Sequence, residues 1–83
     1  MSEVHRRLRV YWRGVHVGTL VDPSADMYWW RAGWEPTDAP ETRRFLAEVD
    51  AGEDPQVVVG DESPHRLAVT ALTDDEIELK GAL

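Results

Sequence analysis

Apolar and polar residues alternate along two neighbouring segments near the start of the chain, and this pattern constrains the fold more than any other. The segments run from Arg7 to Arg13 and from His16 to Val21. A period of two is typical of a strand that buries one face. The side chains predicted to face the core are Leu8, Val10, Trp12, Val17, Thr19 and Val21.

A two-residue turn joins these segments in the predicted hairpin. Glycine comes first in Gly14-Val15, as a type II′ turn requires at its position of positive φ. This turn predicts a register in which Trp12 lies opposite Val17, while Leu20 lies on the outer face.

A third strand is predicted from Met27 to Trp34, after a turn at Asp22–Asp26 that is rich in Asp, Pro and Ser. Because Arg31 favours solvent, Met27 and Trp29, which share its side of the strand, are expected on the outer face. The residues expected in the core are Tyr28, Trp30, Ala32 and Trp34.

One helix and three further strands are predicted in the rest of the chain. The helix runs from about Asp38 to Ala51, with Asp38 and Glu41 as a capping box and Gly52 as its stop. Its apolar stripe consists of Thr42, Phe45, Leu46 and Val49. The strands are predicted at Gln56–Gly60, at Arg66–Leu72 and around Ile77 and Leu79.

The predicted fold is a small single α+β domain over residues 1–83, with residues 1–6 as a flexible N-terminus. Its element order is β-β-β-α-β-β-β. Short turns between successive strands favour antiparallel pairing. The result is a mostly antiparallel curved sheet, or a partly closed small barrel, covered by one helix. Such a sheet would leave an edge strand free to pair with another chain.

Length and composition exclude several classes of protein. The chain has 83 residues and no cysteine, which excludes a disulfide framework and thiolate metal sites. No apolar run reaches the roughly 18 residues of a membrane span. Eight of the nine basic residues are Arg, which is typical of GC-rich bacterial genomes. We therefore expect a cytoplasmic bacterial protein without membrane contact.

The sequence offers no recognisable catalytic, cofactor-binding or metal site. No Gly-x-Ser-x-Gly elbow and no phosphate-binding Gly-Lys-Thr occurs. The histidines, His5, His16 and His65, lie in three separate segments without metal-ligand spacing. The acidic pairs lie in turns, where carboxylates are solvated rather than shifted for acid–base work. We therefore expect a protein that is not an enzyme and needs no cofactor.

Aromatic and basic residues of the first 34 positions form the candidate site. These positions hold all four Trp and both Tyr and carry a net charge of +2, whereas residues 35–83 carry −9. Trp, Tyr, Met and Arg are enriched at protein interfaces. The predicted interaction face consists of Arg9, Tyr11, Arg13, His16, Trp29 and Arg31. The alternative is that the large aromatic side chains, Trp12, Trp30 and Trp34 among them, simply fill a small core.

This face predicts a small non-enzymatic protein-interaction module that binds a protein partner or forms a homodimer. One alternative is binding of single-stranded nucleic acid, with Tyr11 and Trp29 stacking on bases and arginines contacting phosphates. The net charge of −7 weighs against nucleic acid. Another alternative is an acidic inhibitor or immunity-type protein that occupies a basic site on its partner.

The first hairpin also resembles the opening of the N-terminal domain of HipA-type toxin kinases. The resemblance rests on Leu8–Tyr11 and on Gly14–Leu20, which reads Gly-Val-His-Val-Gly-Thr-Leu. No kinase residue lies in these stretches, so the resemblance implies a hairpin and no activity.

Overall fold

The computed structural model describes residues 6–62 and 64–81. In that part of the chain, six strands and one helix follow the predicted order. Their bounds are β1 Arg7–Trp12, β2 Val15–Asp26, β3 Trp29–Pro36, α1 Pro40–Asp50, β4 Gln56–Val59, β5 His65–Leu72 and β6 Glu76–Gly81. Apart from Arg6, the expected flexible N-terminus lies outside the described residues.

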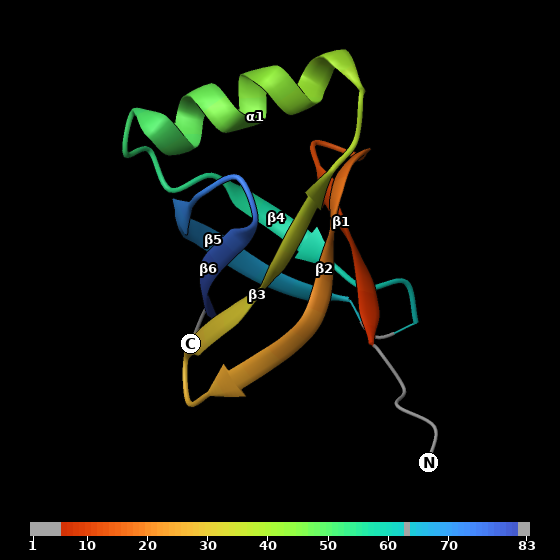
Figure 1. Cartoon of the computed structure of the whole chain (residues 1–83), viewed down its shortest axis with the longest axis vertical. Helices are drawn as coiled ribbons and strands as arrows, with labels where there is room; N and C mark the ends of the chain where they lie inside the picture. The colour runs from red at the N-terminus through yellow and green to blue at the C-terminus, as the bar shows by residue number, and fades with distance from the viewer. Residues whose placement is uncertain (1–5, 63, 82–83) are drawn as a thin grey trace.

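The strands form a closed barrel in the order β1-β2-β3-β6-β5-β4, and every pairing is antiparallel (Figure 1). Closure depends on β1 and β4, where Val10 pairs with Val59 and Tyr11 with Val58. The sequence left open a curved sheet or a partly closed barrel; the structure corrects both to full closure. Each strand therefore has two neighbours, so none is an edge strand along its whole length. The pairing of β1 with β4 is short, however, and within the described residues it leaves the first residues of β1 without a partner strand on that side.

The first hairpin turns one residue earlier than predicted. Its turn residues are Arg13 and Gly14, with φ of 52° and 79°, and Trp12 pairs with Val15. Positive φ at both central residues is typical of a type I′ turn, which matches the twist of the flanking strands. The prediction was wrong because it assigned the glycine to the first turn position rather than the second.

A β-bulge at Val17 changes which residues of β2 face the core. The register shifts between Val10 and Tyr11, so that Val17 is an extra residue on β2. Leu20 is consequently buried, whereas Thr19, which was predicted to point inward, is half-buried. Sequence alternation could not predict this change, because a bulge reverses the faces without changing the composition.

Strand β2 continues through the segment that was predicted to be a turn. The register between β2 and β3 shifts between Val21 and Ser24, and Asp22 has a φ of 51°. Pro23 has no N–H to donate, and a bulge is one of the few places in a sheet that accepts it. The actual turn is at Met27 and Tyr28.

Helix α1 begins two residues later than predicted and lacks the expected capping box. Its N-cap is Ala39, with no capping side chain, and Pro40 occupies the first turn. The hydroxyl of Thr37, rather than the side chain of Asp38, accepts from the Ala39 N–H at 3.5 Å. At the other end, Gly52 has a φ of 74° and its N–H donates to Val49 O, so the predicted glycine stop is confirmed.

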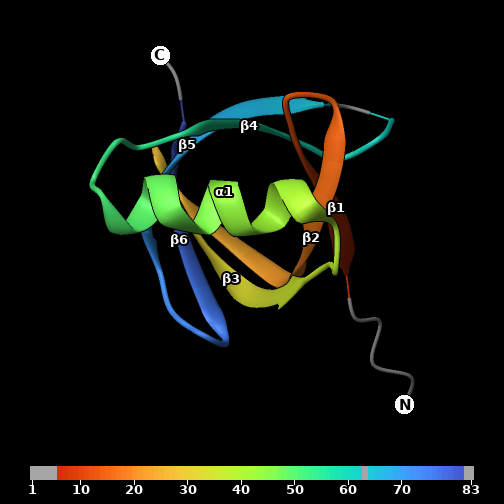
Figure 2. The same ribbon diagram turned by 90° about the horizontal axis from the view of Figure 1, so that it is seen from above.

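Helix α1 lies across one end of the barrel, as Figure 2 shows. Phe45 contacts the rings of Trp12 and Trp34, with centroids 6.0 and 5.8 Å apart. The Trp34 ring covers Gly18, where a Cβ would lie 2.2 Å from it. Within the described residues, this eleven-residue helix is too short and too polar to cross a membrane, and no other helix is present.

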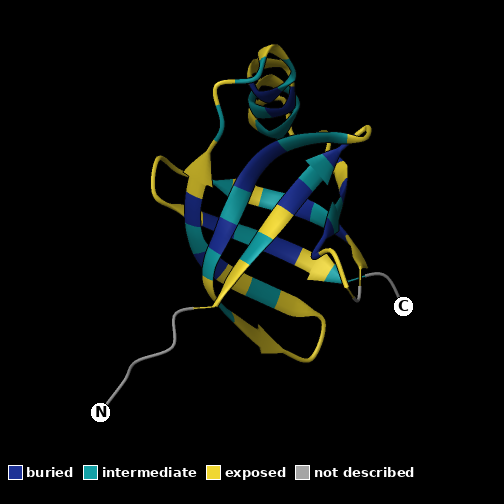
Figure 3. Cartoon of the chain, turned by 90° about the vertical axis from the view of Figure 1, so that its right-hand side faces the viewer, coloured by how far each residue is buried: buried dark blue, intermediate teal, exposed yellow. Residues whose placement is uncertain are grey.

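The core fills the barrel and continues under the helix. Its fully buried members include Val10, Leu20, Phe45, Val69 and Leu79. The predicted core tryptophans Trp12 and Trp34 are buried, and Trp30 packs against the core while remaining half-buried. Exposed residues gather at the end of the β2–β3 hairpin, away from α1 (Figure 3).

Candidate interaction surface

The six residues of the predicted face divide into groups along the barrel wall. Arg9, Tyr11 and His16 lie on the β1–β2 hairpin, where the rings of Tyr11 and His16 are 5.7 Å apart. The Tyr11 hydroxyl donates to Asp61 Oδ1 at 2.7 Å. Hydrogen bonding to Tyr11, with the charges of Tyr11 and Asp61, raises the pKa of Arg9 above its ordinary value.

Arg13 connects the hairpin turn to the helix. Its guanidinium lies 4.5 Å from the ring centroid of Trp12, and its Nη2 is 3.6 Å from Glu48 on α1. These contacts indicate a structural role for this side chain, since a cation over an aromatic face is stabilised by the ring.

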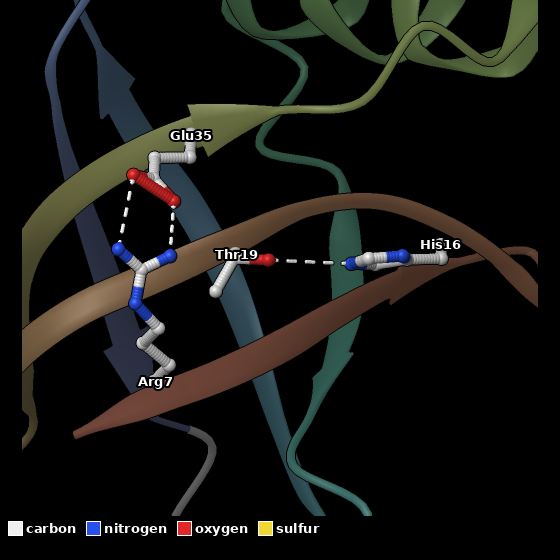
Figure 4. Close-up of polar contacts among 4 residues, drawn as sticks. All are labelled: Arg7, His16, Thr19 and Glu35. Carbon is white, nitrogen blue, oxygen red and sulfur yellow. Dashed lines mark hydrogen bonds and ion pairs between the residues drawn. The ribbon is translucent and has the colours of Figure 1, made fainter.

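Polar contacts also link the outer faces of β1, β2 and β3 (Figure 4). Arg7 on β1 reaches across β2 and donates to both carboxylate oxygens of Glu35 on β3, at 2.5 and 3.5 Å. His16 Nε2 and Thr19 Oγ1, both on β2, lie 3.4 Å apart. These polar groups near Arg9 therefore already have partners within the chain.

Trp29 and Arg31 lie further along the barrel wall, on β3. Arg31 is opposite Ser24 on β2, whereas Arg9 is opposite Thr19. About five residues, or roughly 15 Å of strand, therefore separate the two arginines. Arg31 Nη2 also lies 3.4 Å from Glu78. The six residues thus occupy two surfaces rather than one continuous face.

Trp29 is the centre of a row of three exposed side chains on adjacent strands. Asp26 on β2 and Lys80 on β6 are its direct cross-strand partners. Cross-strand partners point to the same side of a sheet, so all three face outward. Lys80 Nζ lies 5.8 Å from the Trp29 ring centroid. We call Asp26, Trp29 and Lys80 the Trp29 row.

The turn beside this row exposes more apolar surface. Met27 is 84% exposed, and Tyr28 and Trp29 are each 44% exposed. Met27 also has a φ of 57°, a conformation that side chains other than glycine rarely adopt. We call Met27 and Tyr28 the hairpin tip. The fold gains almost no buried surface from the Met27 side chain.

The candidate site predicted from the sequence omitted four members of this surface, namely Asp26, Met27, Tyr28 and Lys80. Tyr28 was wrongly predicted to lie in the core: it is 44% exposed, because the chain turns at Met27 and Tyr28 instead of continuing as a strand. Met27 was expected to face outward but was left out of the face. Asp26 was assigned to a turn, so its pairing with Trp29 was not expected. Recognising a two-residue turn at Met27-Tyr28 would have placed Asp26 opposite Trp29, but Lys80 comes from a distant strand.

A pocket of about 450 Å³ opens between β1 and the β4–β5 connection. The half-buried Trp30 lies at this pocket, with its ring centroid 5.2 Å from that of His65. We call it the β1–β4 gap. Its lining residues are Arg6, Arg7, Leu8, Trp30, Val59, Gly60, Asp61, Glu62 and His65.

Within residues 6–62 and 64–81, no group of three or more His, Asp or Glu side chains could hold a metal ion. Comparisons of the chain with protein-family models, curated proteins and solved structures find no match. The resemblance of the first hairpin to HipA-type kinases therefore rests on the residues of that hairpin alone.

Proposed function

We propose that this protein is a protein-interaction module that pairs with a second copy of itself through the Trp29 row and the hairpin tip. The observation that carries the proposal is the order of the row, in which the aromatic ring of Trp29 lies between the anion Asp26 and the cation Lys80. An isologous interface must be complementary to itself, and this row meets that condition.

The order of charges selects one arrangement of the two copies. A two-fold axis that runs along β3, between two facing sheets, places Trp29 of one copy opposite Trp29 of the other. The same axis places Asp26 of each copy opposite Lys80 of its partner. An axis perpendicular to β3 would instead oppose like charges, which is unfavourable.

Exposure of the hairpin tip supports the same surface. Met27, Tyr28 and Trp29 are the exposed large apolar residues among those described, and adjacent exposed apolar side chains mark interaction sites more often than scattered ones. Few residues take part, so the proposed dimer belongs to the weak, transient class of interfaces.

Binding of nucleic acid is less well supported by the arrangement of charges. Arg13 and Arg31 each lie beside a carboxylate, and the negative charge of Asp61 contributes to the raised pKa of Arg9. Phosphate binding depends on cations that can displace counterions, and these carboxylates compete for the same guanidinium groups. These carboxylates therefore favour a protein over nucleic acid as the partner of the exposed aromatic side chains.

Sedimentation equilibrium over about a hundredfold range of protein concentration tests the proposal, because a weak dimer is populated only above its Kd. We expect the apparent mass to rise from monomer towards dimer. Trp29→Ala should weaken the dimer by about 2 kcal/mol or more, roughly 30-fold in Kd, as for a central aromatic residue. A wild-type chain that stays monomeric at the highest concentration would contradict the proposal.

Charge reversal tests the proposed symmetry directly. Lys80→Glu places like charges opposite each other twice in a two-fold interface, which should cost about 1–2 kcal/mol. Asp26→Lys should cost the same, and combining the two reversals should restore the dimer. Arg44→Glu on the exposed face of α1 is the control, since it makes the same change in net charge as Lys80→Glu at the other end of the barrel. Additive losses in the double variant would exclude this axis.

A further inference from the structure

The β1–β4 gap begins where the backbone ladder between these strands ends. The last bond of that ladder in the described chain runs from Gly60 N to Arg9 O, at 2.9 Å. Beyond Gly60 the chain leaves the barrel wall and returns as β5. The first residues of β1 therefore have β2 on one side and the gap on the other.

The backbone of Arg7 faces this gap. Backbone N–H and C=O groups of consecutive residues point to opposite sides of a strand, so residues two apart point to the same side. Since Arg9 O bonds towards β4, the N–H and C=O of Arg7 point in the same direction, while Arg6 O accepts from Asp22 N on β2. Among the described residues, none bonds to the Arg7 backbone on its gap side. A donor and an acceptor thus stand at an open stretch of strand edge.

Apolar side chains lie beside these backbone groups. Leu8 and Trp30 are half-buried in the gap, and Val59 is buried beneath it. The rim carries both signs of charge, with Arg6 on one side and Glu62 on the other. An unpaired backbone N–H and C=O next to an apolar surface is what strand addition requires. In that binding mode, main-chain hydrogen bonds give affinity and a pocket accepts alternate side chains of the peptide.

We propose that the β1–β4 gap binds an extended peptide segment of a partner protein. One peptide residue exchanges two main-chain hydrogen bonds with Arg7, and its neighbour inserts an apolar side chain against Leu8 and Trp30. Because the rim carries both signs of charge, the site does not require a peptide of a particular net charge. This site is separate from the Trp29 row and does not depend on dimerisation.

The uncharged peptide acetyl-Thr-Thr-Leu-Thr-Thr-amide is a direct probe of this site. Titration of the full chain, followed by ¹H–¹⁵N NMR, should give saturable shifts at the Arg7 amide and at the Trp30 indole N–H. Methylating the backbone nitrogens of the two threonines next to Leu removes the donors that face β1. That change should weaken binding about three- to tenfold, the worth of one hydrogen bond. Methylating the Leu nitrogen, which points away from β1, should leave binding unchanged.

Two variants of Arg7 separate backbone from side-chain effects. Arg7→Pro removes the N–H that faces the gap without breaking a bond to β2, and proline is accepted at such an edge position. We expect it to weaken peptide binding by a similar three- to tenfold, while Arg7→Ala, which keeps the N–H, binds as wild type. Trp29→Ala should also bind the peptide normally, so that failure of the dimer proposal can be distinguished from failure of the peptide proposal. Absence of saturable shifts, or equal binding of both methylated peptides, overturns the inference.

Discussion

Replacing Met27 by glycine should make the protein more stable while weakening its self-association. A left-handed conformation costs a residue with a Cβ about 1–2 kcal/mol, and Met27 has a φ of 57°. Glycine removes that cost but loses about 0.5–1 kcal/mol of additional chain entropy on folding. The side chain is 84% exposed, so almost no burial is lost. The expected net gain is about 0.5–1 kcal/mol.

Thermal unfolding at a protein concentration low enough for the monomer to dominate measures this gain. For a domain of this size, the change corresponds to a rise in Tm of about 2–8 °C. Asp54→Gly is the matched control, because Asp54 has a φ of 47° and lies in an exposed loop remote from the hairpin tip. Aspartate tolerates the left-handed region better than methionine, so its gain should be smaller.

The same Met27→Gly variant should dimerise less well than wild type in sedimentation equilibrium, because the exposed thioether side chain is missing from the proposed interface. Asp54→Gly should dimerise normally. Loss of stability in Met27→Gly would refute the strain argument, since it would mean that the side chain contributes packing to the monomer. Unchanged dimerisation would remove Met27 from the interface.

Two further substitutions test the packing beneath α1. Gly18→Ala places a Cβ 2.2 Å from the Trp34 ring and should lower the free energy of unfolding, measured in urea, by about 1–3 kcal/mol or more. Gly33→Ala is the control: its closest contact is 3.3 Å, so it should cost clearly less. Equal losses of stability in the two variants would contradict the steric explanation. Thr42→Val removes a buried hydroxyl that lies 2.8 Å from Thr37 Oγ1 and should cost about 1–3 kcal/mol. Thr42→Ser keeps the hydroxyl, so its circular-dichroism melting curve should lie closer to wild type than that of Thr42→Val.

Local sequence signals predicted the elements of this fold better than their connections. Alternation identified β1 and the inward side chains Trp30, Ala32 and Trp34 of β3, but it wrongly placed Tyr28 in the core. The glycine stop of α1 was correctly placed at Gly52. Errors arose where the same residue types are typical of two different local structures. Asp22-Pro23 is typical of turns, but here it forms a bulge inside β2, and composition alone does not separate these outcomes.

The candidate surface was harder to predict because it depends on contacts between distant segments. The alternation of residues along its own strand was enough to predict that Trp29 lies on the outer face. Its charged neighbours required two further facts. One is the turn at the hairpin tip, which brings Asp26 opposite Trp29. The other is the adjacency of β3 and β6, which brings Lys80 to its other side and which no local pattern supplies. In the barrel, β6 lies between β3 and β5, and β4 completes the wall against β1. The charge order that supports a self-complementary interface therefore depends on the adjacency of β2, β3 and β6, and a variant that separated β6 from β3 would lose it even with Asp26, Trp29 and Lys80 unchanged.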